Sequence, residues 1–200
     1  INNEYRVWPG DNGALESGTY NLKVDITFPK YQVDVVGTLS ITGIGNNIST
    51  ITAAPSSRHF YVDGSTSVLI LRRIKLTGAS MNFGGSIRVQ TKGTLISSHC
   101  IFSDNYASTS GGAIYGATAL LMLNDTIIEN NEAYSGGGGI YVSSSGTKLS
   151  MNRVIIRNND QLYTSSSSNY GGGGLLISNS VDSIVIRESS FINNQARKGG

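Results

Sequence analysis

Residues 102–107 read FSDNYA, and residues 111–114 read GGAI. The same pair of motifs recurs three more times along the chain, as IENNEA with GGGI, IRNN with GGGL, and FINNQA with GG, beginning at residues 128, 156 and 191. These starting points lie 26, 28 and 35 residues apart (128 − 102, 156 − 128 and 191 − 156), and the extra length falls in a Ser-rich stretch at 162–169. Self-similarity at such a period is typical of a solenoid.

Apolar residues occupy the same places in successive repeats, and the residues between them are mostly polar. Alternation with a period of two predicts strands with one buried face. We therefore expect four inward columns: Leu69, Leu95, Leu121, Leu149 and Ile184; Leu71, Ser97, Leu123, Met151 and Ile186; Ile74, Cys100, Thr126, Val154 and Ser189; and Leu76, Phe102, Ile128, Ile156 and Phe191. One polar register lies between them and is expected to face outward: Arg73, His99, Asp125, Arg153 and Glu188.

A short strand cannot bury its apolar face alone, but stacked turns of a solenoid can. The sequence therefore predicts an all-β fold, a right-handed single-stranded parallel β-helix of about 26 residues per coil with two or three short strands in each. We expect one domain over 1–200, with a cap at 1–17, irregular first coils at 18–75 and regular repeats at 76–200. In the first coils, Leu22, Val24, Ile26 and Phe28 alternate like one strand. Because the chain stops inside a repeat, we expect it to be a piece of a longer protein.

Composition excludes several other classes. Hydrophobic residues make up 38% of the chain and the net charge is +2, which disfavours disorder. Lys and Arg form no cluster larger than a pair, so nucleic acid is not an expected partner. No apolar run approaches the roughly 18 residues that a membrane span needs. A single cysteine excludes an intrachain disulfide framework.

The recurring asparagines follow a strand, and two roles suit them: a left-handed turn conformation, and hydrogen bonding from coil to coil. This column is Asn105, Asn131, Asn159 and Asn194. The glycine pairs suit unusual backbone angles or close contact between coils.

No residue set predicts catalysis, a cofactor or a metal. Cys100 falls in an inward column and is expected to be inert. His99 faces outward, and only His59 could accompany it in a metal site or a Ser/His pair. Four acidic residues could line a turn and hold calcium, although such residues more often only solvate loops: Asp104, Asp125, Glu129 and Asp160.

Two features concern the outer surface. Asn47 and Asn124 match the acceptor sequence for N-glycans. One outward register is apolar, with Ile70, Ile96, Met122 and Val185 interrupted by Ser150, and Tyr115 and Tyr141 stack outward beside the glycine turns. A contiguous apolar stripe often marks an interface. We expect these six apolar and aromatic side chains to face a partner.

The paired motifs FxxN and GGA[ILV], as at 102–105 with 111–114 and at 191–194 with 199–200, resemble the repeats of chlamydial polymorphic outer membrane proteins. The resemblance covers about residues 76–200. It departs from the family pattern where Ile replaces Phe in two repeats and where Gly or Ser replaces the Ala, at positions 139, 174 and 86. It implies a pectin-lyase-like β-helix that serves as a surface-exposed adhesive or structural segment, without catalytic residues to carry over.

The leading functional hypothesis is a non-enzymatic extracellular scaffold or adhesion protein, which could be part of a cell-surface layer or filament. Its expected partners are other surface or matrix proteins, glycans, or further copies of itself. The alternative is a polysaccharide lyase or glycoside hydrolase, since β-helices often host such enzymes. That alternative rests on analogy of fold alone, because no outward column stacks one Asp on another.

Overall fold

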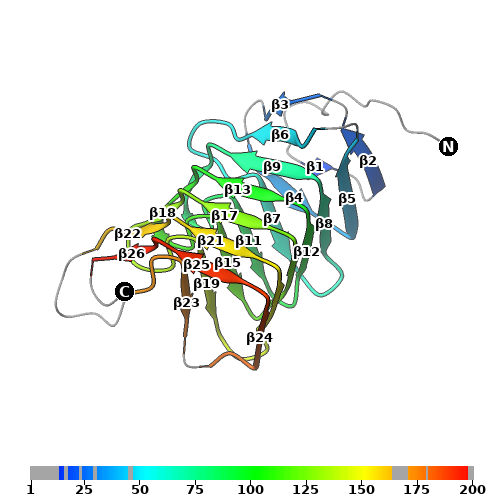
Figure 1. The fold of residues 1–200 in the computed structure, drawn as a ribbon. Coiled ribbons are helices and arrows are strands. Elements are labelled where there is room, and N and C mark those ends of the chain that lie inside the picture. Colours follow the sequence, from blue (N-terminus) through cyan, green and yellow to red (C-terminus); the bar gives the residue numbers. More distant parts are fainter. Residues whose placement is uncertain are drawn as a thin grey trace.

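The computed structural model describes residues 14–15, 18–22, 24–28, 31–44, 47–163, 171–178 and 180–197. In this part of the chain every paired strand is parallel to its neighbour, and the chain winds through four sheets in turn (Figure 1). The predicted all-β, parallel β-helix is confirmed, but each regular coil contributes a strand to four sheets rather than two or three. None of the described residues forms a helix, so none of them forms one able to span a membrane.

Two sheets carry the inward columns expected from the sequence. Sheet A contains β2 (Gly18–Leu22), β5 (Thr38–Gly43), β8 (Val68–Arg72), β12 (Thr94–Ser98), β16 (Leu120–Asn124), β20 (Lys148–Asn152) and β24 (Ser183–Arg187). Sheet C contains β3 (Ile26–Thr27), β6 (Ser49–Thr52), β9 (Ile74–Thr77), β13 (Ile101–Ser103), β17 (Ile127–Glu129), β21 (Ile155–Arg157) and β25 (Ser190–Ile192).

The other two sheets close the coil. Sheet D contains β10 (Ser80–Phe83), β14 (Tyr106–Ser110), β18 (Glu132–Ala133), β22 (Asp160–Gln161) and β26 (Gln195–Ala196). Sheet B contains β1 (Ala14–Leu15), β4 (Val33–Val35), β7 (Phe60–Asp63), β11 (Ile87–Gln90), β15 (Ile114–Ala117), β19 (Ile140–Ser143) and β23 (Leu175–Ile177).

The register of the strands stacks like residues on like. In sheet A, Leu95 pairs with Leu69 on one side and with Leu121 on the other. In sheet C, Phe102 lies in the same way between Leu76 and Ile128. All six side chains are fully buried. The core is therefore a set of apolar ladders that run along the solenoid axis, and each coil rises by about 4.8 Å, the spacing of neighbouring strands.

Sharp corners separate the sheets, and one polar register proves to be a corner rather than the outward face of a strand. Arg73, His99, Asp125, Arg153 and Glu188 all have positive φ, between 46° and 55°. A single left-handed residue turns the chain from sheet A into sheet C, so the strands on its two sides can both point apolar side chains inward. This conformation costs a residue other than glycine about 1–2 kcal/mol, which the packing on both sides must offset.

The corner after sheet C corrects one prediction for the asparagine column. The left-handed residue is the one before each recurring asparagine, namely Asp104, Asn130, Asn158 and Asn193. The recurring asparagines themselves point inward. Asn105, Asn131 and Asn159 are buried, and each side chain donates from Nδ2 to Oδ1 of the asparagine in the next coil, at 2.9 Å in every case. The last acceptor of this amide ladder is Asn194.

The two glycines of each GG motif have different tasks. Gly111 has a φ of +70°, a conformation that glycine adopts without strain. Gly112 lies against the next coil: an added Cβ would be 2.0 Å from the carbonyl oxygen of Gly138 and 2.5 Å from that of Glu132. The first glycine therefore provides the left-handed turn, and the second allows the backbones of two coils to approach closely. Both roles expected from the sequence are present, one at each of the two glycines.

The first coils are less regular than the later ones, and one detail of their prediction is wrong. Leu22 ends β2, Ile26 begins β3, and Val24 between them is exposed, so the run from Leu22 to Phe28 is not a single strand. A bend at Val24 moves the chain from sheet A to sheet C. Of the cap expected at 1–17, only β1 lies within the described residues.

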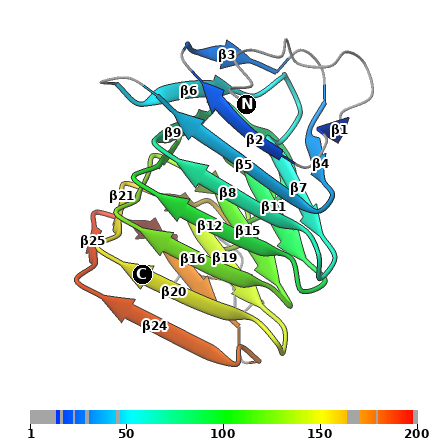
Figure 2. The ribbon, with the colours of Figure 1, turned by 90° about the vertical axis from the view of Figure 1, so that its right-hand side faces the viewer.

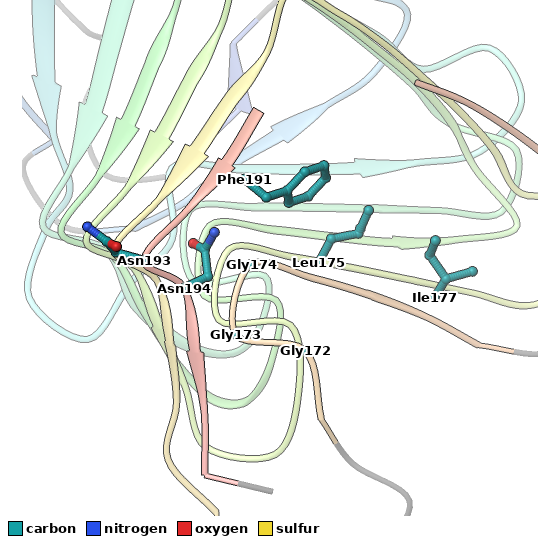
Figure 3. A pocket seen from close by; sticks show the side chains of 8 residues that line it. All are labelled: Gly172, Gly173, Gly174, Leu175, Ile177, Phe191, Asn193 and Asn194. Carbon is teal, nitrogen blue, oxygen red and sulfur yellow. The ribbon is translucent and has the colours of Figure 1, made fainter. Parts of the chain in front are cut away.

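At the other end of the described solenoid, the inward columns become exposed. Phe191 pairs with the buried Ile156, yet it is 47% exposed, whereas Phe102 in the same column is 0% exposed. Figure 3 shows this end, where Phe191, Leu175 and Asn194 lie around a cavity of about 380 Å³. The apolar interior opens into this cavity, so these three lining residues belong to the same inward columns as the core.

Candidate functional site

The apolar stripe expected from the sequence lies on the outer face of sheet A, which Figure 2 presents to the viewer. Ile96 pairs with Ile70 in the coil before and with Met122 in the coil after. Ser150 and then Val185 continue the same register. Met122 is 37% exposed, and the other members of the stripe are half-buried. Three successive coils thus present adjoining apolar side chains to solvent.

A second apolar stripe lies on sheet C, and sequence reasoning missed it. Ile101, Ile127 and Ile155 stack in register, point outward and are half-buried. The signal was present in the sequence, since these isoleucines lie between the inward columns of Cys100 and Phe102 and alternation therefore places them outward. Between the two stripes runs the polar corner, where Asp125 accepts hydrogen bonds from Arg153 at 2.6 and 2.9 Å.

Tyr115 and Tyr141 lie on sheet B, away from the sheet A stripe. They belong to an outward register that we call the aromatic column: Tyr61, Arg88, Tyr115 and Tyr141, each paired with the next. The rings of Tyr115 and Tyr141 are stacked, with centroids 5.4 Å apart and planes 22° apart. The six side chains predicted to form one interface therefore divide between two faces, and the structure does not bring them together.

Arg88 sits inside the aromatic column and has no counterpart among the residues selected from the sequence. The centre of its guanidinium is 5.7 Å from the ring centroid of Tyr61, 5.7 Å from that of Tyr115 and 5.4 Å from that of Phe83. Cation–π attraction therefore holds it from three sides. A second guanidinium, that of Arg58, lies 5.8 Å from the Tyr61 ring. Burial and the charge of Arg88 lower the pKa of Arg58 to about 10.

The nucleophilic and metal-binding candidates are enclosed or dispersed. Burial raises the pKa of the Cys100 thiol to about 11, so it stays protonated at neutral pH. His59 Nδ1 is 2.9 Å from Ser86 Oγ, the contact that a nucleophilic serine requires, but both side chains are fully buried. Within the described ranges no group of three or more His, Cys, Asp or Glu side chains could hold a metal ion.

The buried His59 makes the protein sensitive to acid. Its Nε2–H donates to the Ile51 carbonyl at 3.0 Å, and burial lowers its pKa from 6.5 to about 3. Below pH 6.5 this histidine becomes protonated in the unfolded chain but stays neutral in the folded chain. Its contribution to the free energy of unfolding is therefore fully present above pH 6.5 and is lost as the pH falls toward 3.

We expect the free energy of unfolding to fall by about 2 kcal/mol between pH 7 and pH 5 through this histidine alone. Urea unfolding at the two pH values measures it. The His59→Gln variant should lack most of the difference, whereas the His99→Gln variant, altered at an exposed corner, should retain it. An equal pH dependence in the wild type and in His59→Gln would contradict the assignment.

One pair of carboxylates is stacked, which the outward columns compared in the sequence did not reveal. Glu132 of β18 pairs with Asp160 of β22, so the two acidic residues lie one coil apart. Asp160 Oδ1 is buried and has no hydrogen-bond partner among the described residues, while Glu132 is exposed. Of the other acidic residues considered for calcium, Asp125 pairs with Arg153 and Glu129 pairs with Arg157 at 2.6 Å.

The two N-glycan acceptor sites differ in their surroundings. Asn47 is exposed in the turn before β6. Asn124 is half-buried at the end of β16 and faces outward in register with Ser98 and Asn152. Thr126 of the second site is fully buried, and its hydroxyl donates to the Asn124 carbonyl at 2.8 Å.

Comparison with known proteins identifies the fold family. A family model described as a right handed beta helix region matches residues 33–200, which is most of the chain and includes every regular coil. A search of curated proteins and a search of solved structures each find no match. The matched residues contain the stacked coils, the amide ladder and both apolar stripes, and the protein therefore belongs to the right-handed β-helix family.

Proposed function

We propose that this β-helix is a non-enzymatic scaffold or adhesion segment at the cell surface, and that the sheet A stripe is the face with which it contacts a partner protein. The observation that carries the proposal is the run of Ile70, Ile96 and Met122, which places uninterrupted apolar side chains on three successive coils of sheet A. Contiguous exposed apolar surface of this kind is typical of interaction sites.

Two further observations support the scaffold role. The repeats resemble those of chlamydial polymorphic outer membrane proteins, which implies an adhesive or structural role at a surface. The corner beside the stripe is tied by the Asp125–Arg153 pair, and Arg157 and Glu129 bridge two coils on sheet C. Such cross-coil pairs suit a rigid surface, on which little side-chain ordering is needed when a partner binds.

We expect the double change Ile96→Lys and Met122→Lys to release the protein from its surface partner, with at least a tenfold loss of affinity. Both side chains point outward, so stability should change by less than about 1 kcal/mol. Surface labelling and sizing of the full-length protein in intact cell material would follow the change. The conservative pair Ile96→Val and Met122→Leu is the matched control and should remain bound.

The same double lysine change in the sheet C stripe, at Ile101 and Ile127, tests which face is used. Loss of binding there, with none from the sheet A pair, would move the interface to sheet C. Recovery of the wild-type protein as a soluble monomer with no surface partner would contradict the scaffold proposal.

The Glu132–Asp160 pair favours one other function, that of a polysaccharide-cleaving enzyme. Retaining glycosidases use two carboxyl groups about 5–5.5 Å apart, and neighbouring strands are separated by about 4.8 Å. Cleavage of a polysaccharide by the wild-type protein, with loss of cleavage in Glu132→Gln, would replace the scaffold proposal by this one.

A further inference from the structure

Arg88 in the aromatic column is a cation that lacks an anion. Its Nε–H is buried without a hydrogen-bond acceptor in the described ranges. No described carboxylate lies within ion-pair distance of it, since the ion pairs found there involve Asp125 and Glu129. The three surrounding rings hold the guanidinium in place but accept no hydrogen bond in its plane. Arg88 as a whole is half-buried, but its Nε–H is a buried donor of a charged group and has no acceptor, which is costly.

The nearest charged groups do not supply the missing partner. Arg58 adds a second positive charge, and its two terminal nitrogens already donate to the Phe83 carbonyl at 2.8 Å and to Asn82 Oδ1 at 3.3 Å. Its Nε is also buried without an acceptor in the described part of the chain. Of the two nearby carboxylates, Asp34 accepts from Gln32, and Asp63 accepts from the hydroxyl of Tyr61.

The groups around Arg88 suit a ligand that is rich in hydroxyls. Gln90 donates to the Tyr61 hydroxyl, and the Tyr115 hydroxyl lies 3.5 Å from Ser143 Oγ. These groups lie on the outer face of sheet B, and those of neighbouring strands are one coil apart. Hydrogen-bond donors and acceptors therefore follow one another along the solenoid axis. A chain of sugar units that carries acidic groups could place one acidic group at Arg88 and its hydroxyls along the tyrosines and Gln90.

From this geometry we infer that the aromatic column is a binding site for an acidic saccharide, whose carboxylate or sulfate group is held by Arg88. An arginine fork binds such oxygens with charge-assisted hydrogen bonds, which are stronger than neutral ones. The second positive charge of Arg58 adds attraction for the same anion. The site lies on sheet B, so it does not depend on the partner face proposed for sheet A.

The test uses the full chain and three hexasaccharide probes: one of uronic acids, one sulfated, and one neutral, made of glucose. Titration followed by calorimetry and by NMR of the arginine side-chain resonances should show binding of at least one acidic probe and no binding of the neutral probe. The acidic probe that binds identifies the anion as carboxylate or sulfate. Binding should weaken as salt concentration rises.

The Arg88→Gln variant should bind the acidic probe at least tenfold more weakly, and Arg88→Lys, which keeps the charge but loses the planar fork, should be intermediate. Tyr115→Phe retains the ring beside Arg88 and serves as a second variant if Arg88→Gln does not fold; it should bind more weakly through loss of the hydroxyl. The paired control is Arg157→Gln on sheet C, which should bind like the wild type.

Four outcomes would overturn the inference. The first is equal binding of the neutral and acidic probes. The second is unchanged affinity in a folded Arg88→Gln variant. The third is tighter binding of a poly-glutamate peptide than of either acidic hexasaccharide, which would assign the site to acidic protein segments. Absence of binding by all probes at millimolar concentration would make Arg88 a purely structural part of the aromatic column.

Discussion

The Asn131→Ala variant is expected to lose at least about 4 kcal/mol of unfolding free energy, because this fully buried side chain takes part in five hydrogen bonds. Its Nδ2 donates to the carbonyls of Phe102 and Glu129, both at 3.0 Å, and to Oδ1 of Asn159 at 2.9 Å. Its Oδ1 accepts from the backbone and side-chain nitrogens of Asn105, at 3.1 and 2.9 Å. Alanine leaves these groups buried and unpaired.

Urea unfolding followed by circular dichroism measures the loss. The Asn152→Ala variant is the matched control, since this asparagine faces outward on sheet A and should cost less than about 0.5 kcal/mol. The Asn131→Asp variant distinguishes the hydrogen bonds that this side chain accepts from those that it donates. A carboxylate can still accept from Asn105, but it has no N–H group to donate. If Asn131→Ala were as stable as Asn152→Ala, the amide ladder would contribute nothing to the fold.

The Gly112→Ala variant is expected to lose more than about 3 kcal/mol, because the new methyl group would meet backbone atoms that cannot move aside. The nearest of these are the carbonyl oxygens of Gly138 and Glu132, in the next coil. Separating the two coils enough to admit a methyl group would also weaken the stacking of the columns on either side.

Thermal unfolding of Gly112→Ala should be compared with that of Gly136→Ala. At Gly136 an added Cβ would first meet Cδ2 of Leu176, at 2.5 Å, the far end of a flexible side chain that can rotate away. We therefore expect the control to lose less than about 1 kcal/mol. Similar losses in both variants would show that backbone contact between coils is not what requires the second glycine of the GG motif.

The stacking of the fold could be predicted from the sequence because insertions leave the columns intact. The pairing of Leu121 with Leu149 and of Leu149 with Ile184 follows the predicted alignment across intervals of 28 and 35 residues. A solenoid makes this possible, since each coil repeats the same local environment and the same residue types recur where that environment recurs.

The corners could not be predicted from the same pattern. Asp125 and Arg153 resemble ordinary outward residues of a strand in the sequence, but each adopts a left-handed conformation that no composition rule assigns to Arg. Because each such residue shifts the alternation by one, the strands on both of its sides point apolar side chains inward.

Contacts between residues far apart in the repeat were also hidden from the sequence. Arg88 lies among Phe83, Tyr61 and Tyr115, which come from three successive coils and two sheets. The pairing of His59 with Ser86 likewise depends on how neighbouring coils fill the interior. Column alignment reports what lies directly above and below a residue, but not what lies beside it.

Asn124 and Met122 are neighbours on the outer face of one strand, with a single inward residue between them. A branched oligosaccharide attached to Asn124 would extend over the space that a protein partner needs in order to reach Met122. Material from a bacterial expression host and material from a glycosylating host would then present different molecular surfaces from identical polypeptides. Adhesion measured with one preparation need not be reproduced with the other, and enzymatic removal of the sugar would convert the second kind into the first.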